Sequence, residues 1–215
     1  MINQTSYPMY DFDQRFTLYG RQVVGIDEAG RGPLAGPVVV AACVLDLENP
    51  IPGIDDSKKL SSKIRVGLYD EIISKALGWH VQIMDVESID SLNILNATLT
   101  GMFKAATKLT VVRPLYLIDG NRKVTGLDPQ VQIVKGDSQS ASIAAASILA
   151  KVTRDRIMTE LAIVYPEFGF EKNFGYPTKN HFAMLDQYGA TKIHRRSFAP
   201  VRKAVEQGKI YERQP

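Results

Sequence analysis

The stretch Val24-Gly25-Ile26-Asp27-Glu28-Ala29-Gly30-Arg31-Gly32 joins an apolar run, two adjacent carboxylates and a glycine-rich turn. An apolar run of this kind that ends at glycine is typical of a buried strand. Neighbouring side chains on a regular strand point to opposite faces, so both carboxylates reach one site only if the chain bends there, and we expect the glycines to supply that bend. The alternative, that Glu28 is an ordinary solvent-facing residue, stays open at this point.

Two further aspartates follow apolar runs in the same way. Asp119 ends the run 115–118, and Asp137 comes shortly after the run 131–134. Ligand sites in α/β proteins collect at the ends of strands. A simpler reading also exists for each residue, because Asp119 opens an Asp-Gly-Asn turn and Asp137 would suit a helix N-cap.

Taken together, Asp27, Glu28, Asp119 and Asp137 predict a metal site. Four carboxylates that lie close together repel one another unless divalent cations neutralise them, and hard oxygen ligands select Mg²⁺ or Mn²⁺. Two such ions roughly 3.5–4 Å apart are the standard arrangement for in-line displacement at a phosphodiester.

The remaining pattern predicts an α/β fold. We expect strands over 23–26, 37–45, 78–86, 115–118 and 131–134, and helices from Ser61 or Ser62 to 76, over 91–109, from Ser138 or Ser140 to 164, and over 179–188. A basic segment follows the last helix. We therefore expect one domain over 1–215, with a core at about 20–170 and a small helical appendage at about 171–215.

The composition is that of an ordinary globular chain. Of its 215 residues 45% are hydrophobic and 23% charged, and Cys43 is the single cysteine, so no intrachain disulfide is possible. Nothing in the chain approaches about 18 consecutive apolar residues, and the first 16 residues lack the pattern of a secretory peptide. These features predict a cytoplasmic protein.

Positive charge is concentrated in the last third of the chain. Residues 1–134 hold 13 Lys and Arg against 15 Asp and Glu, whereas residues 135–215 hold 13 against 8. This asymmetry permits a face that binds a polyanion. The candidate phosphate contacts are Lys58, Lys59, Lys151, Arg195 and Arg196, although each of them would also suit a solvated surface.

At this point the residues match a known family, because the chain resembles bacterial ribonuclease HII, the type 2 ribonuclease H, from about Val24 to Arg202. The motifs that carry the resemblance, in chain order, are Gly25 to Pro37, Asp56-Ser57-Lys58-Lys59-Leu60, Asp119-Gly120-Asn121, Lys135-Gly136-Asp137, Ala150-Lys151, Tyr165-Pro166, Gly175-Tyr176, Thr178, His181, His194 to Phe198, and Pro200-Val201.

The resemblance implies a ribonuclease H-like fold, a five-stranded mixed sheet flanked by helices. It implies that the four carboxylates are catalytic and bind two Mg²⁺ or Mn²⁺ ions, and that Gly30, Arg31 and Gly32 with Tyr176 recognise the ribonucleotide and its junction with DNA. Close approach of the backbone at the two glycines is what reading a 2′-hydroxyl requires. One departure stands before the tyrosine, where Asn173-Phe174 replaces the His-Lys or Asn-Lys often found in the family, so a positive charge facing the substrate is missing there.

The implied activity is hydrolysis of the RNA strand of RNA–DNA hybrids and incision on the 5′ side of ribonucleotides embedded in duplex DNA. The products would carry a 3′-hydroxyl and a 5′-phosphate, and the roles would be ribonucleotide excision repair and RNA primer removal. We expect a monomer whose partner is nucleic acid and which does not associate with membranes.

Other interpretations have less support. A serine esterase would place its nucleophile at Ser138, but the sequence there lacks a Gly-x-Ser-x-Gly elbow. A dinucleotide-binding module would need a helix after Gly30-x-Gly32, where an apolar strand pattern follows instead. A different nuclease or resolvase of the same fold, or a non-catalytic nucleic-acid binder, is the nearest alternative. We expect structural or peripheral places for His181 and His194, and see no function for His80.

Overall fold

The computed structural model describes residues 7–212, and the chain divides into two compact units. The first unit runs up to Glu28 and includes Val40–Gln82 and Leu99–Val152, and the second comprises Ala29–Val39, Ile83–Thr98 and the chain from Thr153. The single domain over 1–215 stays a prediction. Within the described part of the chain, no helix has the length and apolar character needed to cross a membrane.

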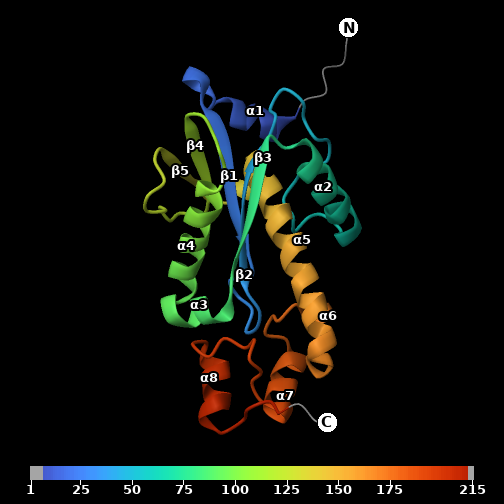
Figure 1. Cartoon of the computed structure of the whole chain (residues 1–215). Coiled ribbons are helices and arrows are strands. Elements are labelled where there is room, and N and C mark those ends of the chain that lie inside the picture. The colour runs from blue at the N-terminus through green and yellow to red at the C-terminus, as the bar shows by residue number, and fades with distance from the viewer. Residues whose placement is uncertain (1–6, 213–215) are drawn as a thin grey trace. The chain divides into compact units, whose positions relative to one another are not determined.

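A mixed five-stranded sheet forms the centre of the fold, in the order β3-β2-β1-β4-β5 (Figure 1). Its strands are β1 (Gln22–Ala29), β2 (Val38–Val44), β3 (Gly78–Met84), β4 (Pro114–Asp119) and β5 (Gln130–Ile133). β1 pairs with β4 in parallel and β4 pairs with β5 in parallel, so these three strands end at the same edge of the sheet. The predicted α/β class and the five predicted strands are confirmed.

The helices are α1 (Pro8–Gln14), α2 (Ser62–Lys75), α3 (Val86–Leu92), α4 (Ile94–Thr107), α5 (Ala141–Val164), α6 (Phe170–Asn173), α7 (Lys179–Tyr188) and α8 (Ala199–Glu206), with short 3₁₀ turns η1 (Leu18–Gly20), η2 (Gly136–Ser138) and η3 (Pro166–Phe168). Ser61 caps α2 by accepting a hydrogen bond from the Ile64 amide. The single helix predicted over 91–109 is wrong, because Asn93 has a φ of 64° and separates α3 from α4.

Packing inside the first unit follows the alternation of strand β1. Val24 and Ile26 belong to one apolar cluster with Met102 of α4, whereas Val23 belongs to another with Ile143 of α5. Gly25 lies where α5 approaches closest, since a Cβ atom there would lie 2.1 Å from the Ser142 carbonyl carbon. The absent side chain therefore lets β1 and the start of α5 touch, and this fixes the end of β1 that carries the carboxylates.

The second unit has aromatic and aliphatic clusters of its own. The rings of Phe168 and Phe170 stack with centroids 5.3 Å apart and lie against Met158 of α5. A second cluster joins Leu185 of α7 to Val201 of α8. Thr178 caps α7 through its hydroxyl, which accepts from the His181 amide at 3.1 Å. These contacts hold the loops of the second unit in place.

Candidate active site

Asp27 and Glu28 both lie on β1. The strand continues through them to Ala29, so the bend that we expected between the two carboxylates is not there and the turn begins at Gly30, whose φ is 96°. Asp27 is 4% exposed and accepts a hydrogen bond from the Glu28 amide at 2.7 Å, while Glu28 is half-buried. Regular strand pairing therefore carries one carboxylate into the interior and leaves the other closer to solvent.

Asp119 stands at the end of β4, on the strand beside β1. The paired register ends with Ile26 opposite Ile118, so Asp27 and Asp119 follow one residue later on neighbouring parallel strands. The Asp119 carboxylate accepts from the Gly136 amide at 2.7 Å, which ties the turn η2 to the end of β4. This bond to a distant turn differs from the Asp-Gly-Asn turn role that we left open, and Asp119 lies at the strand end beside Asp27.

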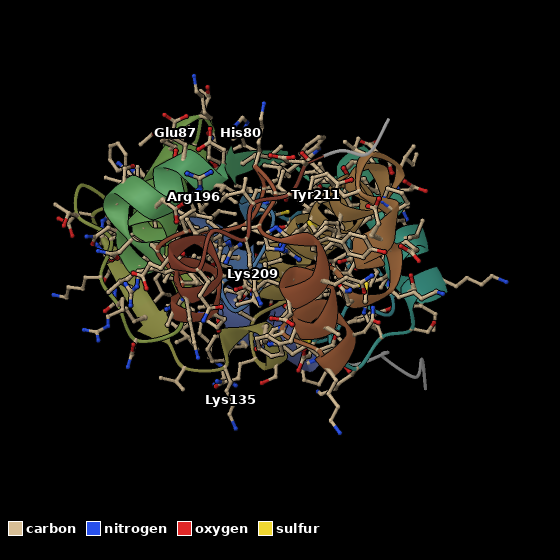
Figure 2. All side chains as sticks on the ribbon, turned by 90° about the horizontal axis from the view of Figure 1, so that it is seen from below. His80, Glu87, Lys135, Arg196, Lys209 and Tyr211 are labelled. Atoms are coloured by element: carbon tan, nitrogen blue, oxygen red, sulfur yellow. The ribbon has the colours of Figure 1, made fainter. Side chains whose placement is uncertain are left out.

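Asp137 belongs to η2 and is 4% exposed. Its expected alternative as a helix N-cap is wrong, since Ser140 directly precedes α5 and its hydroxyl accepts from the Ile143 amide in the first turn at 3.2 Å. The Asp137 carboxylate instead meets the Lys58 ammonium at 2.8 Å. Lys135, which precedes the turn, points away from the ribbon (Figure 2).

Lys58 lies in a turn of the first unit, directly after the buried Ser57. The Ser57 hydroxyl pairs with that of Ser147 on α5 at 2.9 Å. The hydrogen bond to Asp137 raises the pKa of Lys58. Lys58 was expected to contact phosphates, and the structure places its ammonium on a buried carboxylate instead.

The carboxylates act on one another electrostatically. Burial raises the pKa of Asp27 well above its ordinary value, and the charges of Glu28 and Asp119 raise it further. Burial also raises the pKa of Asp119, with a further rise from Asp137, while the Gly136 amide and Lys58 lower it. A hydrogen bond from Ser147 favours the ionised form of Asp27. These effects join all four carboxylates into one electrostatic group.

Between Tyr7 and Glu212, no three His, Cys, Asp or Glu side chains already form a metal site. The four predicted ligands nevertheless have the chemistry that Mg²⁺ or Mn²⁺ requires. They supply only hard oxygen donors, their repulsion favours a cation among them, and Asp137 already holds an ammonium group. The chemistry of these residues therefore fits a divalent cation, and the two-ion arrangement stays a prediction.

The Gly30-Arg31-Gly32 turn belongs to the second unit and is held from inside by Arg195. This side chain is fully buried, and its guanidinium donates to the carbonyls of Gly30 at 2.6 Å, Arg31 at 3.0 Å and Gly36 at 2.9 Å. We expected Arg195 to contact phosphates, and its burial corrects that expectation. Arg196 is exposed, and its amide donates to Asp90 of α3 at 2.9 Å.

Arg154 of α5 is a second buried guanidinium beneath the same segment, and the sequence analysis missed it. It donates to Pro37 at 2.9 Å, Ala35 at 3.1 Å and Phe174 at 3.0 Å, all backbone carbonyls. A Cβ atom at Gly30 would lie 2.0 Å from its Nε. The sequence did contain a signal for its burial, because Arg154 stands four residues before Met158 and so lies on the same, apolar face of α5.

Tyr176 lies beside these groups. Its side chain is 40% exposed, the Arg154 guanidinium carbon lies 5.8 Å from its ring centroid, and a Cβ atom at Gly32 would lie 3.8 Å from the ring. Gly175 precedes it with a φ of 79°, and its carbonyl accepts from the Leu34 amide at 2.8 Å. The structure therefore brings Tyr176 and the glycine turn together.

The departure at Asn173-Phe174 has a structural role. The Asn173 side chain donates to the Phe168 carbonyl at 2.6 Å and accepts from the Gly175 amide at 2.8 Å. Phe174 adopts a φ of 48° and offers its carbonyl to Arg154. These two residues shape the loop in front of Tyr176.

The remaining candidate residues differ in exposure and in partners. Lys59 is exposed and pairs with Asp55 at 3.1 Å, and Lys151 is half-buried on α5. The Ser138 hydroxyl donates to the Lys135 carbonyl at 2.8 Å, an arrangement of a turn residue rather than of an activated nucleophile. His181 and His194 are buried, as expected of structural residues.

Comparison with known proteins identifies the family. The model of the ribonuclease HII family matches residues 24–201. The ribonuclease H2 of Pyrococcus horikoshii OT3 superposes with a TM-score of 0.71 at 29% identity, covering 86% of this chain and 98% of that one. The ribonuclease HII of Archaeoglobus fulgidus, solved in complex with PCNA, gives 0.70 at 28% identity, covering 80% and 91%.

A more distant likeness concerns the fold alone. The Bst-RNase HIII structure with Mn²⁺ has a TM-score of 0.61 at 20% identity, covering 88% of this chain and 70% of that one. The family match extends over most of the chain and includes every carboxylate described above. The chain belongs to the ribonuclease HII family.

Proposed function

We propose that this ribonuclease H, whose activity on RNA–DNA hybrids follows from its family, also incises duplex DNA on the 5′ side of embedded ribonucleotides. The products would carry a 3′-hydroxyl and a 5′-phosphate. The observation that carries the catalytic part is one electrostatic group of four carboxylates, with Asp27, Glu28 and Asp119 at the ends of neighbouring strands and Asp137 in the turn η2. Its cellular roles would be ribonucleotide excision repair and RNA primer removal.

In this proposal the four carboxylates hold two Mg²⁺ or Mn²⁺ ions. Such ions lower the pKa of an attacking water and stabilise the leaving 3′ oxygen. Asp27 is oriented by the Glu28 amide and by Ser147, and Asp119 by the Gly136 amide. These hydrogen bonds favour the ionised carboxylates, which is the form that a cation requires.

Substrate recognition would fall to Gly30, Arg31, Gly32 and Tyr176. Arg31 and Gly32 are exposed, and Tyr176 presents part of its ring to solvent. An aromatic ring can stack on a sugar or base, and glycines allow the backbone to approach a 2′-hydroxyl. Arg196 and Lys151 would add phosphate contacts. We further propose a cytoplasmic monomer.

The catalytic proposal is tested with Asp27→Asn and Asp119→Asn, each nearly unchanged in volume. Both should lose more than nine-tenths of cleavage and most of the Mn²⁺ binding detected by electron paramagnetic resonance, with the melting temperature retained. The matched control is Asp55→Asn, which removes a carboxylate that pairs with Lys59 outside the cluster. Full Mn²⁺ binding by both cluster variants would remove these residues from the metal site.

The substrate proposal is tested with matched duplexes that carry no ribonucleotide, one, or a continuous RNA strand. The protein should cut the second and third and leave the first intact. Tyr176→Ala should reduce nicking at the single ribonucleotide far more than cleavage of the RNA strand, while Tyr176→Phe should be mild because the ring supplies the stacking. Equal losses on both substrates with a lower melting temperature would show that Tyr176 is structural.

A further inference from the structure

Two buried histidines face each other in the second unit. His181 belongs to α7, His194 lies in the loop before α8, and their Nε2 atoms are 3.0 Å apart. Their side chains are 0% and 1% exposed. The rings of Phe168 and Phe170 enclose the pair, with centroids 5.0–6.1 Å from the imidazoles.

The partners of the two rings allow a single arrangement of protons. The Thr191 amide donates to Nδ1 of His194 at 3.1 Å, so that nitrogen carries no proton, and a neutral His194 is protonated at Nε2. At the other end, Nδ1 of His181 lies 2.9 Å from the Tyr176 carbonyl, which can only accept, so Nδ1 of His181 carries the proton. Nε2 of His181 is then free to accept from His194.

Hydrogen bonds therefore run in one direction from the Thr191 amide through His194 and His181 to the Tyr176 carbonyl. Both rings must be neutral, because a proton on either acceptor nitrogen would set two donors against each other. Burial lowers the pKa of both histidines, which keeps them neutral at physiological pH.

The chain of hydrogen bonds links Tyr176 to the Gly30-Arg31-Gly32 turn, the two elements that we propose recognise the substrate. At one end it fixes the carbonyl of Tyr176, whose ring stands beside Gly32. At the other end His194 pairs with Ala35 in an isolated bridge and directly precedes Arg195, which holds the carbonyls of the glycine turn. The imidazoles touch no exposed surface, so they would act on a substrate only through these neighbours.

We propose that His181 and His194 are positioning residues, which hold Tyr176 against the Gly30-Arg31-Gly32 turn and so set the preference for a ribonucleotide–DNA junction. This inference rests on the proposed role of Tyr176. The histidines contribute through one fixed pair of tautomers, with His194 protonated at Nε2 and His181 at Nδ1. Histidine is suited to this task because one ring nitrogen donates while the other accepts.

The first experiment uses the unaltered protein and measures no activity. Two-bond ¹H–¹⁵N correlation spectra distinguish the tautomers of histidine, and the chain contains only three histidines. We expect the Nδ1–H form for His181 and the Nε2–H form for His194, each assigned by its loss in a variant. His80, half-buried on β3, serves as the reference. An Nε2–H form of His181 or a charged His194 at pH 7 would overturn the inference.

The second experiment compares three variants in kinetics. The amide nitrogen of asparagine takes the place of Nδ1, so His181→Asn keeps the donor to Tyr176, whereas His181→Gln moves it to the place of Nε2. We expect His181→Gln to lower the ratio of kcat/KM on a single embedded ribonucleotide to that on an RNA strand about fivefold, the worth of one hydrogen bond. The loss should lie mainly in KM, and His181→Asn should restore the ratio to within about twofold.

His80→Asn is the matched control and should leave the ratio unchanged. Equal losses on both substrates for His181→Gln and His181→Asn, together with a lower melting temperature, would overturn the positioning role. Tyr176→Ala separates the positioning role of the histidines from the recognition role of Tyr176 itself. A ratio that responds to Tyr176→Ala but not to His181→Gln overturns this inference alone, whereas a ratio that ignores Tyr176→Ala removes the proposed recognition role as well.

Discussion

Asp13 is a buried carboxyl group outside the active site, and its titration should control the stability of the first unit. It lies on α1, is 0% exposed, and its Oδ2 accepts from the Ser142 amide at 2.8 Å at the start of α5. Its Oδ1 has no hydrogen-bond partner among residues 7–212. Burial raises the pKa of Asp13 to about 6 against the hydrogen bonds from Ser140 and Ser142, which lower it.

The sign of the effect follows from proton binding. Between the unfolded pKa of 3.8 and the folded value of about 6, the folded protein holds a proton on Asp13 that the unfolded chain has lost. Stability that is present at pH 4 is therefore lost as the pH rises through 6. A difference of about two pKa units at about 1.4 kcal/mol each gives a loss of at most about 3 kcal/mol.

Asp13→Asn removes this titration while keeping the shape of the side chain. Its buried amide costs about 1–3 kcal/mol at every pH, so the informative quantity is how the stability difference between the variant and the natural protein changes with pH. We expect that difference to shift in favour of Asp13→Asn by up to about 3 kcal/mol between pH 4 and pH 7.5.

Urea unfolding at pH 4, 5, 6 and 7.5 measures the difference. The fluorescence of Trp79, the single tryptophan, reports on the first unit, to which Asp13 also belongs. Asp11→Asn, an exposed aspartate on the same helix, is the matched control and should show a flat difference. A flat or opposite pH profile for Asp13→Asn would refute the buried-carboxyl reasoning.

Three further predictions concern other residues. Gly25→Ala should cost at least about 1–3 kcal/mol and lower the melting temperature sharply, because its Cβ atom would meet the backbone of α5 at 2.1 Å, and an unchanged melting temperature would contradict the packing described. Lys58→Met should increase the thermal stabilisation given by Mg²⁺ because Asp137 loses its ammonium partner, whereas Lys59→Met should not; equal shifts would place Asp137 outside the ion site. Arg196→Gln should reduce the slope of log affinity against log salt by up to about one, and an unchanged slope would place this residue off the binding face.

The strand-end positions of two carboxylates were predictable because their signal is local. Asp27 and Asp119 each end an apolar run, and parallel pairing of the two runs brings their ends to the same edge of the sheet. Ser61 was predictable as an N-cap for the same reason, since a cap acts on an amide three residues away. Patterns of this kind need no knowledge of the tertiary structure.

Arg195 shows where local patterns fail. It sits in a basic segment and looked like a surface residue, yet its partners are carbonyls more than 150 residues earlier in the chain. Every residue has a backbone carbonyl, so the sequence around Arg195 gives no sign that distant carbonyls are its partners. The break at Asn93 was missed because a single residue with positive φ interrupts an otherwise helical pattern without a glycine or proline to mark it.

The two guanidiniums beneath the glycine turn also bear on the entropy of substrate binding. Glycines give a loop many accessible conformations, and a ligand that selects one of them loses affinity in doing so. Arg154 and Arg195 together donate to the carbonyls of Gly30, Arg31, Ala35, Gly36 and Pro37, so folding has already restricted this segment. The turn is preorganised, and a nucleic acid bound there, as we propose, would meet a backbone that folding has already ordered.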